Sequence, residues 1–264
     1  MTTRAFHAGD RAVLRISGRD ARPFLQGLVT NDVARLDQGA LYAALLTPQG
    51  KYLFDFFLVP EADDVLVDVA ADRAAALAQR LGLYRLRAAV AIEATALGVV
   101  LGEGAAPEGA FADPRDARLG WRAILADPEA LLAGLDRLDP ADYARRRIEL
   151  AVPETGTELV AEDSYILEMG FERLNGVDFR KGCYVGQEVT ARMKHKTELK
   201  KGLVAVGVNG EAPPPGTEVL AGERPAGRLL SVAGDRGLAH LRFDRASGRL
   251  TAGAAEITRI EASG

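Results

Sequence analysis

The sequence predicts an α+β protein with two parts, a mixed α/β body and a smaller all-β domain at the C-terminal end. The first hundred residues alternate β-rich runs with helical patterns. After Lys201, short β-rich runs are separated by turns that contain Pro, Gly or Asp, which is typical of a small barrel or sandwich. We therefore expect a body at 1–200 and a terminal domain at 201–264. A weak pattern near 95–140 leaves open whether the body has two subdomains.

The elements of the first half have recognisable start and stop signals. Asp20 is a candidate cap and Pro23 fits a first helical turn, and the apolar residues Phe24, Leu25, Leu28 and Val29 follow at helical spacing. They predict a short helix. The elements expected after it are strands at 40–47 and 52–60 joined by a turn at 48–51, a strand at 64–70, a helix at 72–82 that ends at Gly82, and a strand at 86–94.

The second half is predicted to contain two helices and then only strands. A helix at 140–152 begins at Pro140 and ends before Pro153. A second helix is expected at 187–196, where Glu188, Arg192 and Lys196 share a face at i, i+4 spacing. The β-rich runs that follow lie at 202–208, 226–232, 237–243 and 254–260.

Composition limits the possible partners and location. The formal net charge of −4 gives no global reason to expect nucleic acid or an anionic membrane. The opening MTTRAFHAGDR lacks the apolar region of a signal peptide, and no apolar run approaches about 18 residues, so no membrane partner is expected. A single cysteine excludes an internal disulfide and fits a reducing compartment. We expect a cytoplasmic protein.

Asp55 is the one carboxylate in the apolar strand expected at 52–59. Strict alternation places Asp55 with Leu53 and Phe57, and places Tyr52 and Phe54 on the opposite face. A carboxylate in such surroundings needs hydrogen bonds, a charged partner or a polar cleft. It could therefore hold the N–H groups of a flat heterocycle at a cleft wall. The alternative is that the strand ends near Phe54 and that Asp55 meets solvent or pairs with an arginine.

Cys183, the only cysteine, lies between Gly182 and Gly186 just before the helix expected at 187–196. A helix N-terminus and the nearby Lys181 form a setting that lowers the pKa of a thiol. The alternative is an inert, buried thiol. The flanking glycines and charged residues favour an exposed position.

Charge is uneven along the chain. Between Arg173 and Lys201, eight Lys and Arg residues stand against three Asp and Glu residues. This excess favours an anionic partner at this face, either a carboxylated small molecule or an RNA backbone, although a solvated helix face gives the same pattern. Three scattered histidines and one cysteine give no metal-ligand spacing, and neither a phosphate loop nor a serine-nucleophile motif is visible.

The segment KGCYVGQE, Lys181 to Glu188, followed by Ala191 and Arg192, resembles the signature of the YgfZ group of folate-binding proteins. These proteins are relatives of the glycine-cleavage aminomethyltransferase, the T-protein. The resemblance extends through FLQGLVTNDV, YAALLTPQGKYLFDF and RRRIELAVPETGTEL into the β-rich end. It implies a three-part ring whose mixed α/β body binds tetrahydrofolate, or a one-carbon derivative, in a central channel, with a C-terminal β-barrel.

The resemblance also implies roles for individual residues. Asp55 matches the second aspartate of the T-protein pattern G-G-x-x-D-D, which holds the folate nitrogens, whereas Phe54 replaces the first and counts against full transferase chemistry. Glu168, in an E-x-G-F setting, matches the pterin-binding glutamate. The remaining cofactor-binding candidates are Asn31, Asp32, Arg147, Lys181, Tyr184, Gln187, Glu188 and Arg192. If the chain is an enzyme, Cys183 and Asp55 are the catalytic candidates.

Three functions follow from these observations. The first is a tetrahydrofolate-binding accessory protein that supports assembly or repair of iron–sulfur enzymes, including tRNA-modifying ones, because the YgfZ cysteine is linked to that work. One thiol cannot hold a cluster alone, so any cluster would be shared with a partner protein. The second is a folate-dependent aminomethyltransferase, and the third an RNA-binding module that uses the basic face and contacts tRNA. The run KTELKK at 196–201 departs from the family, which usually has a glycine there.

Overall fold

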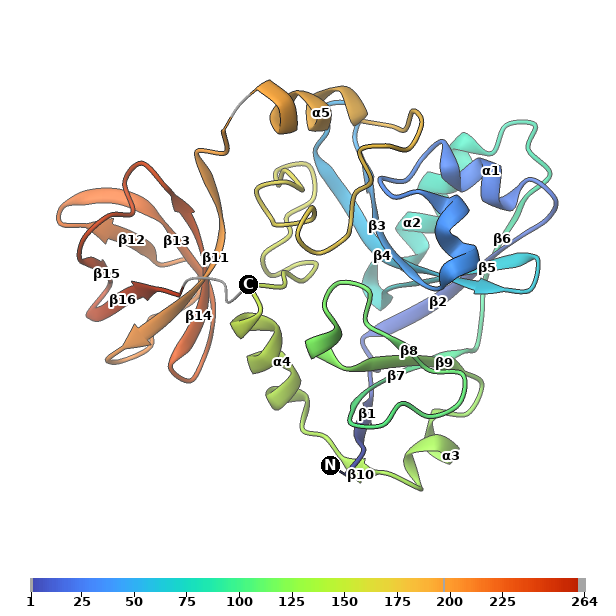
Figure 1. The fold of residues 1–264 in the computed structure, drawn as a ribbon, viewed down its shortest axis with the longest axis horizontal. Coiled ribbons are helices and arrows are strands. Elements are labelled where there is room, and N and C mark those ends of the chain that lie inside the picture. Colours follow the sequence, from blue (N-terminus) through green and yellow to red (C-terminus); the bar gives the residue numbers. More distant parts are fainter. Residues whose placement is uncertain (1, 197, 261–264) are drawn as a thin grey trace.

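The computed structural model describes residues 2–196 and 198–260 of the chain. Figure 1 shows a mixed α/β body on one side and a β-barrel on the other, with helix α4 (Pro140–Glu149) between them. Helix α4 contacts three barrel strands. The α+β class, with a terminal barrel, is confirmed, whereas the division of the body into subdomains stays a prediction.

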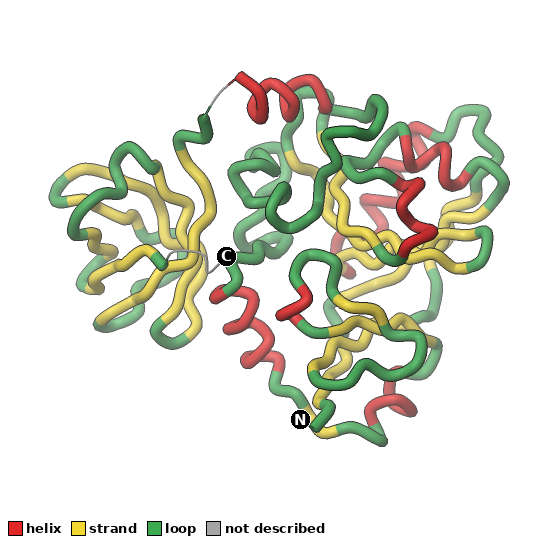
Figure 2. Tube along the Cα trace, viewed as in Figure 1, coloured by secondary structure: helices red, strands yellow, loops and turns green. Residues whose placement is uncertain are grey.

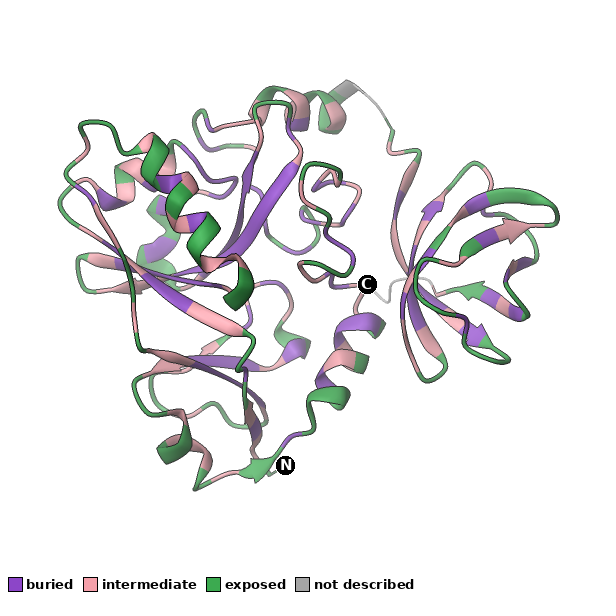
Figure 3. Ribbon diagram, turned by 180° about the vertical axis from the view of Figure 1, so that it is seen from behind, coloured by how far each residue is buried: buried purple, intermediate pink, exposed green. Residues whose placement is uncertain are grey.

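The first sheet of the body carries most of the large apolar side chains. Its strands, in spatial order, are β3 (Leu41–Leu46), β4 (Tyr52–Glu61), β5 (Asp64–Ala70), β2 (Arg11–Ser17) and β6 (Ala91–Ala94). Helices α1 (Ala21–Gln26) and α2 (Ala71–Tyr84) and the short 3-10 helix η1 (Val33–Gln38) accompany this sheet. Leu25, Leu77 and Leu81 from the two α-helices pack on one face of the sheet and form the helix-side core. All six residues of β3 are buried (Figure 3).

The opposite face of this sheet packs against a long segment without regular structure. Residues 151–186 contain no named helix or strand and appear as loop between body and barrel in Figure 2. Ile166, Phe171 and Leu174 of this segment meet Tyr42 and Phe57 of the sheet in the loop-side core. The chain then enters α5 (Gln187–Lys196), which begins beside the turn that joins β3 to β4.

A second sheet occupies the region that the sequence left weakly defined. Its strands, in order, are β10 (Asp136–Arg137), β1 (Arg4–His7), β7 (Gly98–Glu103), β9 (Trp121–Leu125) and β8 (Phe111–Ala112). The short helices nearby are η2 (Ala117–Leu119) and α3 (Pro128–Leu132). Strand β1 lies in the interior of this sheet, so the N-terminal residues complete a layer that is otherwise built by residues 98–137.

The terminal domain is a closed barrel rather than a sandwich. Its strands, in order, are β11 (Lys201–Asn209), β14 (Arg236–Arg242), β13 (Arg224–Ala233), β12 (Glu218–Ala221), β15 (Leu250–Ala252) and β16 (Ala255–Arg259). The short strands β12 and β15 were not predicted. Closure leaves no free sheet edge, and small residues such as Ala226, Ala239 and Ala252 fill the barrel interior.

Several elements begin or end at residues other than those predicted. Helix α1 ends at Gln26, before Leu28 and Val29, and the Asp20 carboxylate accepts the amide hydrogen of Ala89 instead of capping the helix. Helix α2 continues past Gly82 to Tyr84, and only the last part of the strand expected at 86–94 pairs in the sheet. Helix α4 stops at Glu149. The expected β3–β4 hairpin is confirmed.

Candidate functional site

Asp55 lies on the loop-side face of β4 because the strand contains a β-bulge. On the partner strand, Leu45 pairs with Phe54 but the next residue, Leu46, pairs with Tyr52, so Leu53 is extra. Leu53 and Phe54 therefore both face the helix-side core. Tyr52 and Asp55 share the opposite face, and the strict alternation predicted for Tyr52 and Leu53 is wrong at this point.

The Asp55 carboxylate is buried, with 4% of the residue exposed, and hydroxyl groups surround it. Tyr42 donates to Oδ2 at 3.0 Å and Tyr52 donates to Oδ1 at 2.8 Å. Thr155 also donates to Oδ1 from the loop after α4. The strand continues to Glu61, so the alternative in which Asp55 ends the strand in solvent is wrong.

Both tyrosines are held in the donor state by their surroundings. Burial, followed by the charge of Asp55, raises the pKa of Tyr42 and of Tyr52 well above the usual value of a phenol. Loss of either proton would place a second negative charge beside the carboxylate. The hydroxyls therefore remain donors, and they fix the carboxylate in one orientation.

Asp55 lines a pocket of about 480 Å³ between the two sheets of the body. This volume lies within the range of roughly 300–1,000 Å³ that is usual for small-molecule sites. The aromatic rings of Phe57 and Tyr143 line its walls, and Arg11, Arg115, Arg122 and Glu154 add charge. A flat ligand with both N–H donors and anionic groups would meet complementary chemistry here.

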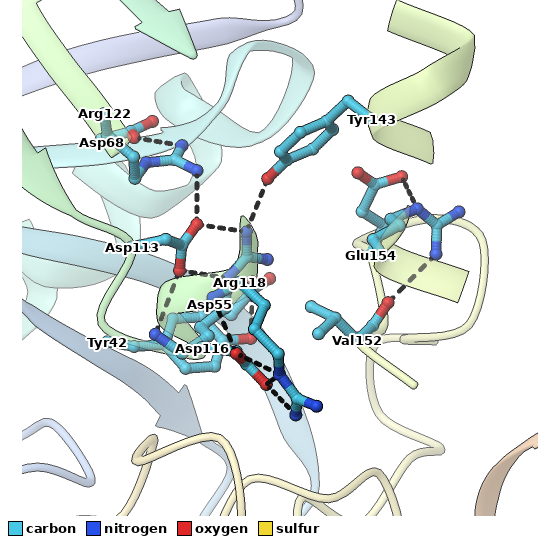
Figure 4. Close-up of polar contacts among 12 residues, drawn as sticks. Tyr42, Asp55, Asp68, Asp113, Asp116, Arg118, Arg122, Tyr143, Val152 and Glu154 are labelled. Atoms are coloured by element: carbon cyan, nitrogen blue, oxygen red, sulfur yellow. Dashed lines mark hydrogen bonds and ion pairs between the residues drawn. The ribbon is translucent and has the colours of Figure 1, made fainter. Parts of the chain in front are cut away.

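Behind the aromatic wall lies a buried ion-pair network that connects the two sheets. Arg122 contacts Asp68 at 2.7 Å and Asp113 at 3.2 Å, and Arg115 contacts Asp113 at 2.8 Å. Arg11 closes the network on Asp68 at 2.6 Å. These arginines hold the pKa of Asp68 and of Asp113 low despite the opposing effect of burial. Figure 4 shows Asp68, Arg122 and Asp113 in contact beside Tyr143.

Two arginines of this network also stack on the aromatic wall. The guanidinium carbon of Arg122 lies 3.9 Å from the centroid of the Phe57 ring, and that of Arg115 lies 4.9 Å from it. Arg115 also donates to the Tyr143 hydroxyl at 3.0 Å. Arginine side chains therefore form the pocket wall on the side of the second sheet, each paired with a buried aspartate.

Arg147 positions the loop that supplies Thr155. Its guanidinium contacts Glu154 at 2.9 Å and Glu158 at 3.0 Å, and it donates to the Val152 carbonyl at 3.2 Å. Glu158 also accepts from Ser231 of barrel strand β13. Arg147 is therefore placed behind the pocket, where it holds the loop, and it is not among the residues that line the pocket.

Glu154 is the carboxyl group at the pocket wall with a raised pKa. Burial raises it, and the nearby Arg147 only partly opposes the effect. Its side chain keeps 43% of its surface exposed, so it can exchange protons with water. Glu154 therefore keeps its proton to a higher pH than a glutamate in water does.

Glu168 lies in a different pocket from Asp55. It is held between Lys201, at 3.2 Å, and His240, at 3.4 Å, in a cavity of about 480 Å³ between the body and the barrel. The contacts with His240 and Lys201 outweigh burial and lower the pKa of Glu168. The structure does not bring Glu168 together with Asp55, and its pterin-binding role stays a prediction.

Asn31, Asp32 and Lys181 come together behind β3. The Asn31 amide donates to the carbonyls of Tyr42, at 2.8 Å, and Asn175, at 2.7 Å, and Asp32 accepts from Ala34 at the start of η1. The buried Lys181 ammonium donates to three backbone carbonyls in residues 26–31. Burial lowers the pKa of Lys181 to about 8, against the opposing charges of Asp32 and Asp178.

The cysteine motif lies beside the turn that joins β3 to β4, and none of its residues lines the pocket. Cys183 is exposed, so the alternative of a buried thiol is wrong. Tyr184 is buried, and its amide donates to the Gln187 side chain at 3.3 Å. Glu188 and Arg192 pair at 2.9 Å on the exposed face of α5, as their spacing predicts. The side chain of Lys196 and all of Thr197 lie outside the described residues.

Much of the basic segment 173–201 is satisfied within the fold. Arg173 donates to the carbonyls of Leu150 and Ala151, and Lys181 to the carbonyls named above. Lys194 pairs with Glu172, and Lys201 with Glu168. The excess positive charge is therefore smaller at the surface than the sequence predicts.

Sequence reasoning did not identify the charged wall of the pocket. Arg115, Arg122 and Glu154 of the wall, and Asp68 and Asp113 behind it, come from four separate segments; only the local pair Asp113 and Arg115 is close in sequence. One signal was available, because Asp68 is a carboxylate in the apolar strand 64–70, as Asp55 is in its own strand. Among the described residues, no group of three His, Cys, Asp or Glu side chains could hold a metal ion, and no helix is long and apolar enough to cross a membrane.

A solved structure with the same fold is known. The structure of the glycine cleavage system aminomethyltransferase T from Bartonella henselae matches 98% of this chain and 85% of its own, with a TM-score of 0.81 and 13% sequence identity. At that identity the match shows the fold alone. Residues 200–262 match the family described as CAF17, C-terminal beta-barrel domain. The class is therefore a protein of aminomethyltransferase T fold with a CAF17-type barrel.

Two mitochondrial relatives identify the family to which the chain belongs within this class. The human iron-sulfur cluster assembly factor IBA57 is 34% identical over 97% of this chain and 82% of its own length. The mouse protein of the same name is 33% identical over 93% of this chain and 79% of its own. The chain belongs to the IBA57 family of iron–sulfur cluster assembly factors.

The comparisons correct two expectations. The resemblance to YgfZ is right for the wider fold, but the relatives carry the name IBA57 and not YgfZ. The expected cytoplasmic location is contradicted, because these relatives are mitochondrial proteins. A single cysteine is compatible with several compartments and does not choose among them.

Proposed function

We propose that this protein supports the assembly of iron–sulfur proteins and binds a reduced folate in the Asp55 pocket. The observation that carries the proposal is the buried, oriented carboxylate of Asp55 at the wall of a pocket with aromatic sides. The name of the relatives supports the iron–sulfur part, and the aminomethyltransferase fold supports a folate-sized ligand.

The chemistry of the pocket supports a pterin more specifically. A pterin ring presents several N–H groups along one edge, and Asp55 offers two carboxylate oxygens that three hydroxyls hold in place. Phe57 and Tyr143 offer flat apolar surface to a ring. Arg11, with 15% of its side chain exposed, offers a positive charge to the carboxylates of the glutamate tail.

The iron–sulfur role is assigned to the exposed Cys183 turn. An exposed thiol next to a helix can contact a cluster that a partner protein also holds, since one thiolate is too few to retain a cluster alone. By the resemblance of the motif, we include tRNA-thiolating enzymes among the client proteins.

The two other candidate functions have less support. Aminomethyl transfer is disfavoured because Phe54 occupies the position of the first aspartate and points into the helix-side core, where Arg73 stacks on it at 5.0 Å. RNA binding is disfavoured because Arg173, Lys181, Lys194 and Lys201 already have partners within the fold.

Complementation tests the whole proposal. A cell line that lacks its own IBA57-type protein would receive the wild-type chain, Asp55→Asn, Cys183→Ala or the exposed surface control Asp63→Asn. Activities of iron–sulfur enzymes and tRNA thiolation would then be measured. We expect the wild type and the control to restore both, and the two site variants to fail. Full rescue by Asp55→Asn would contradict a role for the pocket.

A further inference from the structure

The side chain of Lys181 is buried, although the turn that follows it in the cysteine motif is exposed. Only 7% of the residue is exposed, and its ammonium donates to the carbonyls of Gln26 at 2.7 Å, Val29 at 2.5 Å and Asn31 at 2.9 Å. A buried cation with three donors is matched here by three acceptors. It draws together the backbone between α1 and η1, which lies about 150 residues away in sequence.

A continuous set of hydrogen bonds leads from this backbone to the pocket. The backbone carbonyl of Asn31 accepts from Lys181, and the side-chain amide of Asn31 donates to the backbone carbonyl of Tyr42 at 2.8 Å. The Tyr42 hydroxyl then donates to Asp55 Oδ2 at 3.0 Å. Lys181, Asn31, Tyr42 and Asp55 are all buried. In such surroundings polar groups tolerate little displacement, because each lost bond leaves a group unsatisfied.

Thr30 provides a second set of hydrogen bonds between the same segments. Its hydroxyl donates to the Gly176 carbonyl at 2.6 Å and accepts from the Ala44 amide at 2.8 Å, while its carbonyl accepts from Asp178 at 3.1 Å. Hydrogen bonds therefore join three segments to one another: residues 29–32, strand β3 and residues 175–181. The segment leading to the cysteine turn and the strand bearing Tyr42 form one unit.

Within the described part of the chain, the turn is anchored at its two ends. Gly182 and Cys183 are exposed, whereas Lys181 before them and Tyr184 after them are buried. A small movement of the Lys181 anchor must therefore change the exposure and orientation of the Cys183 thiol. This makes the thiol a reporter for the position of Lys181.

We propose that Lys181 is a positioning residue that couples the exposed turn at Gly182 and Cys183 to the Asp55 pocket, through Asn31 and Tyr42. A ligand that fixes Asp55 then also fixes the turn, and a partner that holds the turn changes the affinity of the pocket, because such coupling is reciprocal. The ligand-dependent part of this inference rests on the proposed folate site.

The coupling is measured as the rate at which iodoacetamide alkylates Cys183 in the full chain. A double-mutant cycle without ligand compares wild type, Tyr42→Phe, Lys181→Met and the double variant. We expect Tyr42→Phe to change the rate at least threefold, and to lose this effect in the Lys181→Met background. If the double variant gives the product of the two single effects within about twofold, the sites are independent and the proposal is overturned.

Arg180→Met is the matched control, because it removes the neighbouring, exposed positive charge and leaves the hydrogen bonds of Lys181 in place. It should preserve the effect of Tyr42→Phe, and loss of that effect in this variant would overturn the specific role of Lys181. If Lys181→Met fails to fold, the single variant Tyr42→Phe still tests the proposal. An alkylation rate of Cys183 equal to that of the wild type would contradict coupling between the turn and the pocket.

A ligand arm separates this inference from the folate proposal. Calorimetry first establishes whether 5-formyltetrahydrofolate binds the wild type. If it binds, saturation should change the alkylation rate at least threefold, and an unchanged rate overturns the coupling while leaving the folate site intact. If it does not bind, the folate proposal fails and the ligand-free cycle alone decides the role of Lys181.

Discussion

Tyr52 and Asp55 are three residues apart on β4 and yet meet on the same face of the strand, where the Tyr52 hydroxyl donates to Asp55 at 2.8 Å. The extra residue at the β-bulge makes this possible, because an odd separation on a regular strand places side chains on opposite faces. The bulge therefore gives Asp55 a second phenolic donor in addition to Tyr42.

Tyr52→Phe removes that donor and keeps the ring. The Asp55 carboxylate loses a hydrogen bond in a buried position, so we expect the free energy of unfolding to fall by about 1.5–3 kcal/mol. Urea denaturation measures this loss. Tyr84→Phe, on the far side of the helix-side core, is the control and should leave the midpoint unchanged. An unchanged midpoint for Tyr52→Phe would mean that its hydroxyl does not support Asp55.

Arg147→Met tests the loop that carries Thr155. The variant leaves the buried carboxylate of Glu158 without its cation, so the free energy of unfolding should fall by about 3–5 kcal/mol. Arg145→Met on the same helix removes an exposed charge paired with Glu149, and it should have little effect. Similar urea midpoints for the two variants would show that Arg147 is not structurally important.

The two glycines of the cysteine motif should respond differently to alanine. At Gly186, φ is +82°, and a Cβ would lie 2.5 Å from the Thr47 carbonyl oxygen in the hairpin turn. Gly186→Ala should cost about 1–3 kcal/mol from its backbone conformation alone, and more from the clash. Nothing lies within 4 Å of a Cβ at Gly182, so Gly182→Ala should leave the melting temperature close to wild type. Equal melting temperatures would contradict the close packing of the motif against the hairpin.

The ion pairs of Glu168 should make the junction of body and barrel sensitive to acid. Its pKa is lowered below the usual 4.5 by His240 and Lys201. The group binds protons more weakly in the folded chain, so its stabilising contribution is present above pH 4.5 and is lost as the pH falls through the lower folded value. Glu168→Gln should reduce the loss of stability between pH 5 and pH 3, measured by urea denaturation at each pH. The same loss in both proteins would exclude this contribution.

The sequence predicted the elements whose signals are local. The β3–β4 hairpin, α5 and four barrel strands each have their own apolar pattern and turn residues. The second sheet was missed because β8 and β10 have two residues each and because β1 joins from the far end of the chain. Strands this short give no periodicity, and pairing between distant segments leaves no local signal.

The candidate site was predictable where a single residue breaks a pattern. Asp55 was recognised as a carboxylate among apolar neighbours, and Cys183 as a thiol between glycines. The β-bulge in β4 could not be predicted from the sequence, because a shift of one residue in pairing depends on the partner strand. The network of Asp68, Asp113, Arg115 and Arg122 depends on the approach of two sheets, which no spacing in the sequence records.

Calorimetric titration of 5-formyltetrahydrofolate into the wild type, Asp55→Ala and Cys183→Ala tests the folate pocket most directly. We expect saturable binding to the wild type, at least tenfold weaker binding to Asp55→Ala, or about 1.4 kcal/mol, and nearly unchanged binding to Cys183→Ala, whose thiol lies outside the pocket. Absence of binding to all three proteins, or equal affinity of wild type and Asp55→Ala, would contradict the account.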